Sequence, residues 1–389
     1  MTVWTEEDRR ARLARRHLLT SEERTDDVVA VADALVALHS SDPVTVYLSV
    51  LARMRTPSLT RVEEALYAQR SLVRHHAMRR TLWVATPATV RRMHAAATRK
   101  VAAAERRRTE GYLRAAGIDD PGGWLDRARD HVVGALREHG PLTARQLGLL
   151  VPELAHPLVV GSGNWTATQA AHTRVVTLLG FEGVLVRTRP AGTWVNGQYT
   201  WALMEEWVPG GVDVLGEGEA AAALADHWLR RFGPATSTDL QWWAGWTKSL
   251  TSRALADSGA EPVELDGRAA WVAAGDTARQ PAPAPWVALL PSLDPTVMGW
   301  KERGHYLPAE AAPAWDRNGN AGNTVWVDGR VVGAWAQAPD GRVRLHWFSD
   351  VPTSRRTEVE RRAAEVEQWL GEVRYTVRFP GEISKELLS

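Results

Sequence analysis

The most constraining feature of this sequence is a short pattern that occurs twice. Residues 136–147 and 229–240 carry Leu, Arg, Gly, Pro, Thr and Leu at the same places. Gly commonly stands just beyond a helix end, Pro cannot continue that helix, and Thr caps the start of the next one. The pattern therefore predicts a sharp corner between two helices, as in a helix-turn-helix unit. We expect at least two such units in the chain.

The segments after the first corner predict the rest of a winged helix. Thr166 and Gln169 have the spacing of a capping box, which predicts a third helix over 167–179 that Gly180 closes. Residues 183–195 then read as a hairpin, the wing of the unit.

The second corner is followed by the same order of segments. Residues 249–257 predict a third helix, and 263–272 predict a hairpin with Asp266-Gly267 as its turn. Such units often bind DNA, but the same corner also occurs in modules that bind protein or simply pack together.

The N-terminal part of the chain predicts a third unit of this kind. Apolar periodicity and turn residues predict helices over 5–17, 28–38, 44–54 and 60–68, followed by a hairpin over 71–84. Thr86-Pro87 then starts a long helix whose exposed face is the most basic in the sequence. A basic face of this kind suits a phosphate backbone, although solvated helix faces are at least as common.

The C-terminal part has a different character. A Pro/Ala linker covers 277–285, and strands are expected over 286–290, 325–335 and 339–348, joined by Asp-Gly turns as a meander or small barrel. A helix starting at Ser354 and a last strand through Tyr375, Val377 and Phe379 complete it.

The predicted fold class is α+β and mainly helical, with three tandem winged-helix domains followed by a small C-terminal β-barrel. The expected boundaries are 1–120, 121–212 and 213–278 for the winged helices and 286–389 for the barrel. A chain of 389 residues is too long for one core, which agrees with several domains.

The charge balance favours DNA as a partner, and the base composition of the genome is the alternative explanation. Lysine occurs only at Lys100, Lys248, Lys301 and Lys385, so the basic side is almost wholly arginine, whose planar fork suits phosphates and base edges. Isoleucine occurs only twice, however, and a GC-rich genome would produce the same arginine bias.

Several classes of chemistry are missing from the sequence. It has no cysteine, no phosphate-binding Gly loop, no His-Glu-x-x-His and no Gly-x-Ser-x-Gly motif. We therefore expect no metal and no cofactor. No signal peptide or apolar run of membrane-spanning length is present, which predicts a cytoplasmic protein.

One polar cluster follows an apolar helix stripe. His39, Ser41 and Asp42 come where the stripe through Leu35 and Leu38 ends, immediately before Pro43. We expect them at a helix C-terminus, where such residues are more often caps than catalysts.

Several motifs together resemble the AlkZ/YcaQ-like winged-helix DNA glycosylases over nearly the whole chain. They are Leu38–Pro43 followed by Tyr47-Leu48-Ser49, then 78–82, 289–294 and 328–335. The resemblance implies three winged helices and a barrel around duplex DNA, and excision of bulky or crosslinking N7-alkylated purines without metal or cofactor. It also places the family's catalytic motif, Gln, an apolar residue, then Gln or Asp, on His39, Ser40 and Ser41.

The departure from that motif leaves a chemically reasonable site. An N7-alkylated purine is cationic and its glycosidic bond is already weak, so an enzyme needs mainly to place a water and to stabilise an oxocarbenium-like sugar. We expect neutral His39 to position or deprotonate the water, Ser41 to add a hydrogen bond, and Asp42 to stabilise the sugar cation or to orient His39. The alternative is that His39 and Asp42 only cap helices.

The expected partner is double-stranded DNA carrying alkylated bases, bound by a monomer. Arg79 and Arg80 are assigned to phosphate contacts by resemblance, and a structural salt bridge is the alternative for Arg79. The other expected DNA contacts are Arg91, Arg92, Lys100, Thr166, Gln169, His172 and Arg174. A non-catalytic DNA-binding protein and a protein-binding scaffold are the alternative functions.

Overall fold

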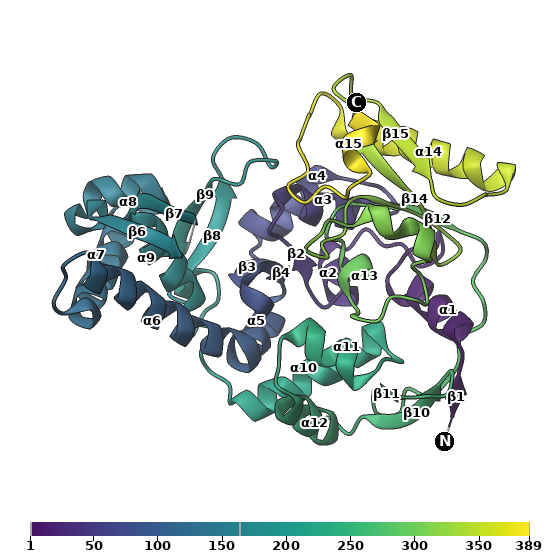
Figure 1. Ribbon diagram of the computed structural model, residues 1–389, viewed down its shortest axis with the longest axis horizontal. Helices are drawn as coiled ribbons and strands as arrows, with labels where there is room; N and C mark the ends of the chain where they lie inside the picture. The colour runs from purple at the N-terminus through teal and green to yellow at the C-terminus, as the bar shows by residue number, and fades with distance from the viewer. Residues whose placement is uncertain (1, 163–164, 389) are drawn as a thin grey trace.

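The computed structural model describes residues 2–162 and 165–388 and has a mixed α and β fold (Figure 1). Its N-terminal part packs helices on a small sheet of order β2-β4-β3. The elements are α1 (Glu6–Arg16), α2 (Val28–Ala34), β2 (Leu38–His39), α3 (Pro43–Leu51), α4 (Leu59–Glu63), which continues as a wider turn over Glu64–Ala68, β3 (Val73–His76), a short turn over Met78–Arg80, and β4 (Leu82–Ala85). The helices and the hairpin expected here are present.

A long helical stretch leads into a lobe at one side of the molecule (Figure 1). This stretch consists of α5 (Pro87–Met93), a wider turn over His94–Thr98, and α6 (Arg99–Ala115). The lobe contains α7 (Pro121–His139), β5 (Leu142–Thr143), α8 (Ala144–Leu150), a turn over Pro152–Ala155, β6 (Pro157–Ser162), β7 (Trp165–Ala170), α9 (Ala171–Phe181), β8 (Leu185–Pro190) and β9 (Tyr199–Leu203), and a short turn over Met204–Glu206 follows it. Thr143 caps α8 as the repeated pattern predicts.

The second copy of the pattern lies in the next unit. It contains α10 (Glu217–Phe232), α11 (Ser237–Ala244), α12 (Lys248–Asp257), β10 (Glu261–Leu265) and β11 (Arg268–Val272). Thr236 caps α11 with Asp239 as its reciprocal partner, so the corner forms as predicted. The N-terminal strand β1 (Val3–Trp4) adds to this sheet in parallel with β10.

The C-terminal part forms an open sheet of order β12-β13-β14-β15, not the closed barrel that was expected. Its elements are β12 (Val287–Leu290), α13 (Pro295–Met298), a turn over Ala309–Ala314, β13 (Thr324–Val327), β14 (Arg330–Gln337), β15 (Val343–Trp347), α14 (Thr353–Leu370) and α15 (Ser384–Leu388). The barrel prediction was wrong because β12 and β15 stay at opposite edges, with α14 packed against β12.

Two further local predictions were wrong. Thr166 and Gln169 lie in β7, paired with β6, and the helix starts only at Ala171, because a capping-box spacing also fits an alternating strand. Tyr375, Val377 and Phe379 form no strand, and this segment pairs with none of the described sheets. The wing of the lobe has its first strand where expected, but its second strand begins at Tyr199 rather than near Thr193.

The hydrophobic core joins segments that are far apart in the sequence. Apolar side chains of α2 and α3 share one cluster with those of β12, β13 and α14. The lobe over 113–203 has a cluster of its own. No helix among the described residues is long and apolar enough to cross a membrane.

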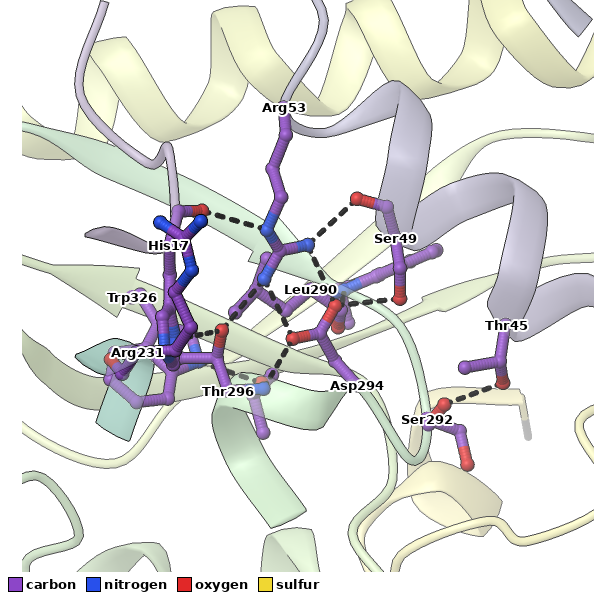
Figure 2. Close-up of polar contacts among 12 residues, drawn as sticks. His17, Thr45, Ser49, Arg53, Arg231, Leu290, Ser292, Asp294, Thr296 and Trp326 are labelled. Atoms are coloured by element: carbon purple, nitrogen blue, oxygen red, sulfur yellow. Dashed lines mark hydrogen bonds and ion pairs between the residues drawn. The ribbon is translucent and has the colours of Figure 1, made fainter. Parts of the chain in front are cut away.

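A buried ion pair fixes the N-terminal part to the C-terminal sheet (Figure 2). Arg53, just after α3, and Asp294, just before α13, are fully buried and lie 2.8 Å apart in a two-pronged contact. Ser49 donates to Asp294 at 2.6 Å, and Thr296 accepts from Arg53 at 2.7 Å. The 289–294 segment therefore holds α3, whose first turn follows the polar cluster at His39.

Candidate active site at the β2–α3 junction

The three expected catalytic residues lie between a strand and a helix, not at a helix C-terminus. Helix α2 ends at Ala34, and Val36 has a φ of 62°, which turns the chain out of the helix. Leu38 and His39 then pair with Val84 and Trp83 of β4. The helical stripe continues to Leu38 in the sequence, but pairing with the free edge of β4 satisfies the backbone better than one more helical turn.

The His39 ring is neutral and nearly enclosed. Only 4% of the residue is exposed, and its ring centroid lies 4.7 Å from that of Trp83. Burial, and then the charge of Arg79, lower the pKa of His39 to about 3. The backbone N–H of Ser41 donates to Nδ1 at 3.4 Å, so the ring proton belongs on Nε2. His39 can therefore offer a hydrogen-bond donor from Nε2.

The Asp42 carboxylate caps α3 and holds the C-terminal tail. One oxygen accepts from the backbone N–H of Val44 at 3.3 Å, and the other from the backbone N–H of Arg378 at 3.0 Å. Burial raises the pKa of Asp42 against the effect of these two hydrogen bonds. The cap that sequence reasoning offered as the alternative role for Asp42 is thus present, and no hydrogen bond joins Asp42 to the described His39 ring.

The two serines of the cluster face different neighbours. Ser41 is half-buried, which makes it the most exposed of the candidate catalytic residues, and its hydroxyl accepts from the backbone N–H of Leu82 at 3.4 Å. The Ser40 hydroxyl is buried and accepts from Nε of Arg74 at 2.9 Å. A ligand would reach the cluster from the side of Ser41.

Arg79 lies beside this cluster without a carboxylate partner. Its guanidinium carbon sits 4.0 Å from the centre of the Trp242 ring, and Arg303 contacts the same ring. Burial, and then the charge of Arg303, lower the pKa of Arg79 to about 10. The alternative of a structural salt bridge does not hold among the described residues, since a cation–π contact takes its place.

The structure does not bring the other expected DNA contacts together at this site. Arg80 and Arg174 both pair with Glu105, at 2.9 Å and 3.2 Å, and Arg91 donates to backbone carbonyls of Pro209 and Gly211. The remaining residues are half-buried Arg92 on α5, exposed Lys100 on α6, exposed Thr166 and half-buried Gln169 on β7, and half-buried His172 on α9.

Sequence reasoning missed two arginines that touch the cluster. Arg74 contacts Ser40 from β3, and Arg378 contacts Asp42 through its backbone. Arg74 lies in a strand between apolar Leu72-Val73 and two histidines, and all four residues of the strand are buried, so no alternation in the sequence marks Arg74 as inward-facing. Nothing local in the sequence marks Arg378.

Comparisons with known proteins identify the family of the chain. A sequence profile described as "DNA glycosylase AlkZ-like" matches residues 32–369. The chain belongs to the AlkZ-like DNA glycosylase family. This membership confirms the function class predicted from the sequence, a DNA-binding glycosylase of DNA repair.

A solved structure shares the fold of this AlkZ-like protein. The DNA glycosylase AlkZ of Streptomyces sahachiroi superimposes with a TM-score of 0.71 at 21% sequence identity, over 96% of this chain and 98% of the other. No curated protein sequence matches. The glycosylase thus shares its fold along its length with a protein to which it has little sequence identity.

Proposed function

We propose that this glycosylase hydrolyses the N-glycosidic bond of N7-alkylated purines, bulky or crosslinked ones included, in double-stranded DNA. The base would leave without a covalent enzyme intermediate, and neither a metal nor a cofactor is needed for this step. The protein would act as a monomer in the cytoplasm. Residues 121–212 and 213–278, which contain the two helix corners, would serve as winged helices on the duplex.

The observation that carries this proposal is the grouping of three polar side chains at the β2–α3 junction. A histidine kept neutral by burial, a half-exposed hydroxyl and a carboxylate stand within four consecutive residues. This set fits hydrolysis of a bond whose leaving group is already cationic, because such a reaction needs a placed water more than a strong acid.

The hydrogen bonds suggest how each residue would act. With its proton on Nε2, His39 would position the attacking water by donating to it instead of deprotonating it. The bond from the sugar to the neutral base breaks, the bond from the sugar to the water oxygen forms, and the proton that this water loses passes to bulk solvent. Ser41 would add a second hydrogen bond from the open side. Asp42, whose oxygens are fixed by two backbone N–H groups, would face the developing sugar cation as a preorganised negative charge.

The test measures base release from a duplex that carries an N7-alkylguanine adduct, detected as abasic sites. Asp42→Asn keeps the cap of α3 and removes the charge, so we expect release to fall by about 100-fold or more. Its NH2 cannot accept from the Arg378 N–H, so stability should fall by about 1–3 kcal/mol, and thermal melting confirms that the variant is still folded in the assay. His39→Ala should also lose most activity. His39→Gln restores the side chain expected of the family and should stay within about tenfold of the parent protein.

Two outcomes would change the assignment. If the unaltered protein releases no base from several adducts of different size, the catalytic proposal is wrong. If Asp42→Asn is inactive while His39→Ala is not, the water is placed by another group and Asp42 alone keeps its role.

A second function, binding of damaged DNA without cleavage, is favoured by one observation. Both Asp42 oxygens already accept backbone hydrogen bonds, and only 3% of the residue is exposed. Tight binding of the adduct duplex without base release would support this function over the glycosylase.

A further inference from the structure

A cavity lies in the lobe, and Arg74 of β3 packs against one of its wall residues, Tyr199. Its volume is about 550 Å³, and it is bounded by α8, α9, β8 and β9. Arg145, His172 and Arg187 line it, and no Asp or Glu is among the described residues of its wall. A neighbouring cavity of about 690 Å³ also has arginines in its wall, but there Asp130, Glu182, Glu205 and Asp213 accompany them.

Two polar groups in the wall of the smaller cavity are buried without a partner. These are Nε of Arg187 and the hydroxyl of Tyr199, both shielded from solvent. Arg187 makes cation–π contacts with Trp201 and Tyr199, at 4.8 Å and 5.7 Å from the ring centres. Because buried polar groups are usually satisfied, these two unpaired groups in wall residues favour a ligand that accepts hydrogen bonds, which a small side-chain shift would let them reach.

Further positive charge surrounds the same wall. The Arg74 guanidinium lies 4.5 Å from the centre of the Tyr199 ring, on which Arg187 also packs. The Arg378 guanidinium lies against Gly197 of the cavity wall, where a β-carbon would clash with it. None of these three arginines forms a salt bridge with a described residue. Burial lowers the pKa of Arg187 to about 10. Tyr199 acts to raise this pKa, whereas the charges of Arg74 and Arg378 lower it further.

We propose that this cavity binds a phosphodiester group of the DNA strand that carries the damaged base. An anion with several acceptor oxygens would satisfy Arg187 and Tyr199 together and offset three cations that have no carboxylate partner. Arginine suits this role because its fork can meet two phosphate oxygens at once.

Two arginines that pack against the cavity wall, Arg74 on Tyr199 and Arg378 on Gly197, connect it to the candidate active site. Arg74 donates to Ser40, and the backbone of Arg378 donates to Asp42. A phosphate held here would therefore fix one strand relative to His39 and its neighbours. The inference rests on the proposed function in that it concerns the same DNA substrate, but it needs no catalysis.

The experiment measures binding of the full-length protein to an undamaged, fluorescently labelled duplex over a series of salt concentrations. Arg187→Gln should weaken binding about tenfold, and the slope of log K against log salt should become shallower by about 1, as for one lost phosphate contact. Tyr199→Phe keeps the ring and should weaken binding about threefold. Arg187→Lys keeps the charge, and its affinity for duplex should lie between those of Arg187→Gln and the parent.

Arg137→Gln is the matched control, since Arg137 belongs to the same lobe but pairs with Glu205 in the wall of the larger cavity. Its affinity and salt slope should stay within about twofold of the parent. The proposal is wrong if Arg187→Gln and Tyr199→Phe both bind duplex like the parent and melt within a few degrees of it. It is also wrong if inorganic phosphate raises the Tm of the parent but not of Arg187→Gln while duplex binding is the same in both, because the site then holds a free anion.

This test and the base-release test fail separately. If no adduct is excised but the salt slope of Arg187→Gln still shows the loss of one phosphate contact, the phosphate site is supported and the catalytic proposal is wrong. If base release is normal in the parent and Arg187→Gln binds duplex as the parent does, the phosphate site is wrong and the proposed function is supported.

Discussion

At the scale of single residues, Arg53 uses every N–H donor of its guanidinium. Nε donates to the His17 carbonyl, one terminal nitrogen to the Ser49 carbonyl and to Asp294, and the other to Asp294 and Thr296 (Figure 2). A buried charge is tolerated only when it is paired and its hydrogen bonds are complete. The pair therefore specifies how α3 and the 289–294 segment meet.

Removing one partner of this pair should be costly. Asp294→Ala leaves the Arg53 charge buried and alone, so we expect the free energy of unfolding to fall by about 3–5 kcal/mol, measured by urea denaturation. The double variant Arg53→Met with Asp294→Leu removes both charges and should lose clearly less than Asp294→Ala. Equal losses in the two variants would mean that packing, not the unpaired charge, sets the cost.

The candidate site could be predicted only as far as its residues are neighbours in the sequence. His39, Ser41 and Asp42 were found because they are adjacent and polar at the end of an apolar stripe. Arg378 reaches Asp42 across a separation of 336 residues, and Arg187 belongs to another unit of the fold. Contacts of this kind depend on tertiary packing, which local periodicity in the sequence does not predict.

At the scale of elements, the predicted helix corners formed because their signals are local and redundant. Gly, Pro and Thr each favour the same break, and the Thr143 and Thr236 hydroxyls both accept the expected backbone N–H. Thr166 carried a single signal, its spacing from Gln169, and that spacing is equally compatible with the strand in which both residues lie. One signal was too little to distinguish a helix start from a strand.

This difference can be measured with two equivalent substitutions. Thr236→Ala removes the cap of α11 and should lower the free energy of unfolding by about 1 kcal/mol. Thr166→Ala changes an exposed strand residue, so its effect should stay within about 0.5 kcal/mol. A loss of about 1 kcal/mol for Thr166→Ala would restore the capping role that the structure denies.

At the scale of the whole molecule, the core is unusually rich in neutral histidine. His17, His39, His75, His76, His94 and His305 are all buried, and burial lowers the pKa of each ring. They come from the N-terminal part, the long helical stretch and the segment between β12 and β13. His76 also packs against Phe181 and Trp201 of the lobe, so several contacts between units of the fold hold a buried histidine.

These histidines should make the protein sensitive to mild acid. An unfolded histidine binds a proton below about pH 6.5, whereas the folded His39 does so only near pH 3, so the unfolded state takes up more protons in between. Stability should therefore be complete above about pH 7 and should fall as the pH drops, by about 2 kcal/mol at pH 5 for His39 alone. Urea titrations at pH 7.5 and pH 5 measure the loss, and His39→Gln should show a loss smaller by that amount.

The short strand β1 constrains the order in which the contacts of the fold can form. Val3 and Trp4 are synthesised well before their only sheet partners among the described residues, Glu264 and Leu265, which come some 260 residues later. The Trp4 side chain stays exposed until the residues that bury it are available, which are Val263, Leu265, Ala270 and Val272. The pairing of β1 with β10 is thus a non-local contact that cannot form before residue 265 has been made, and a substitution of Trp4 should act on this late step of folding.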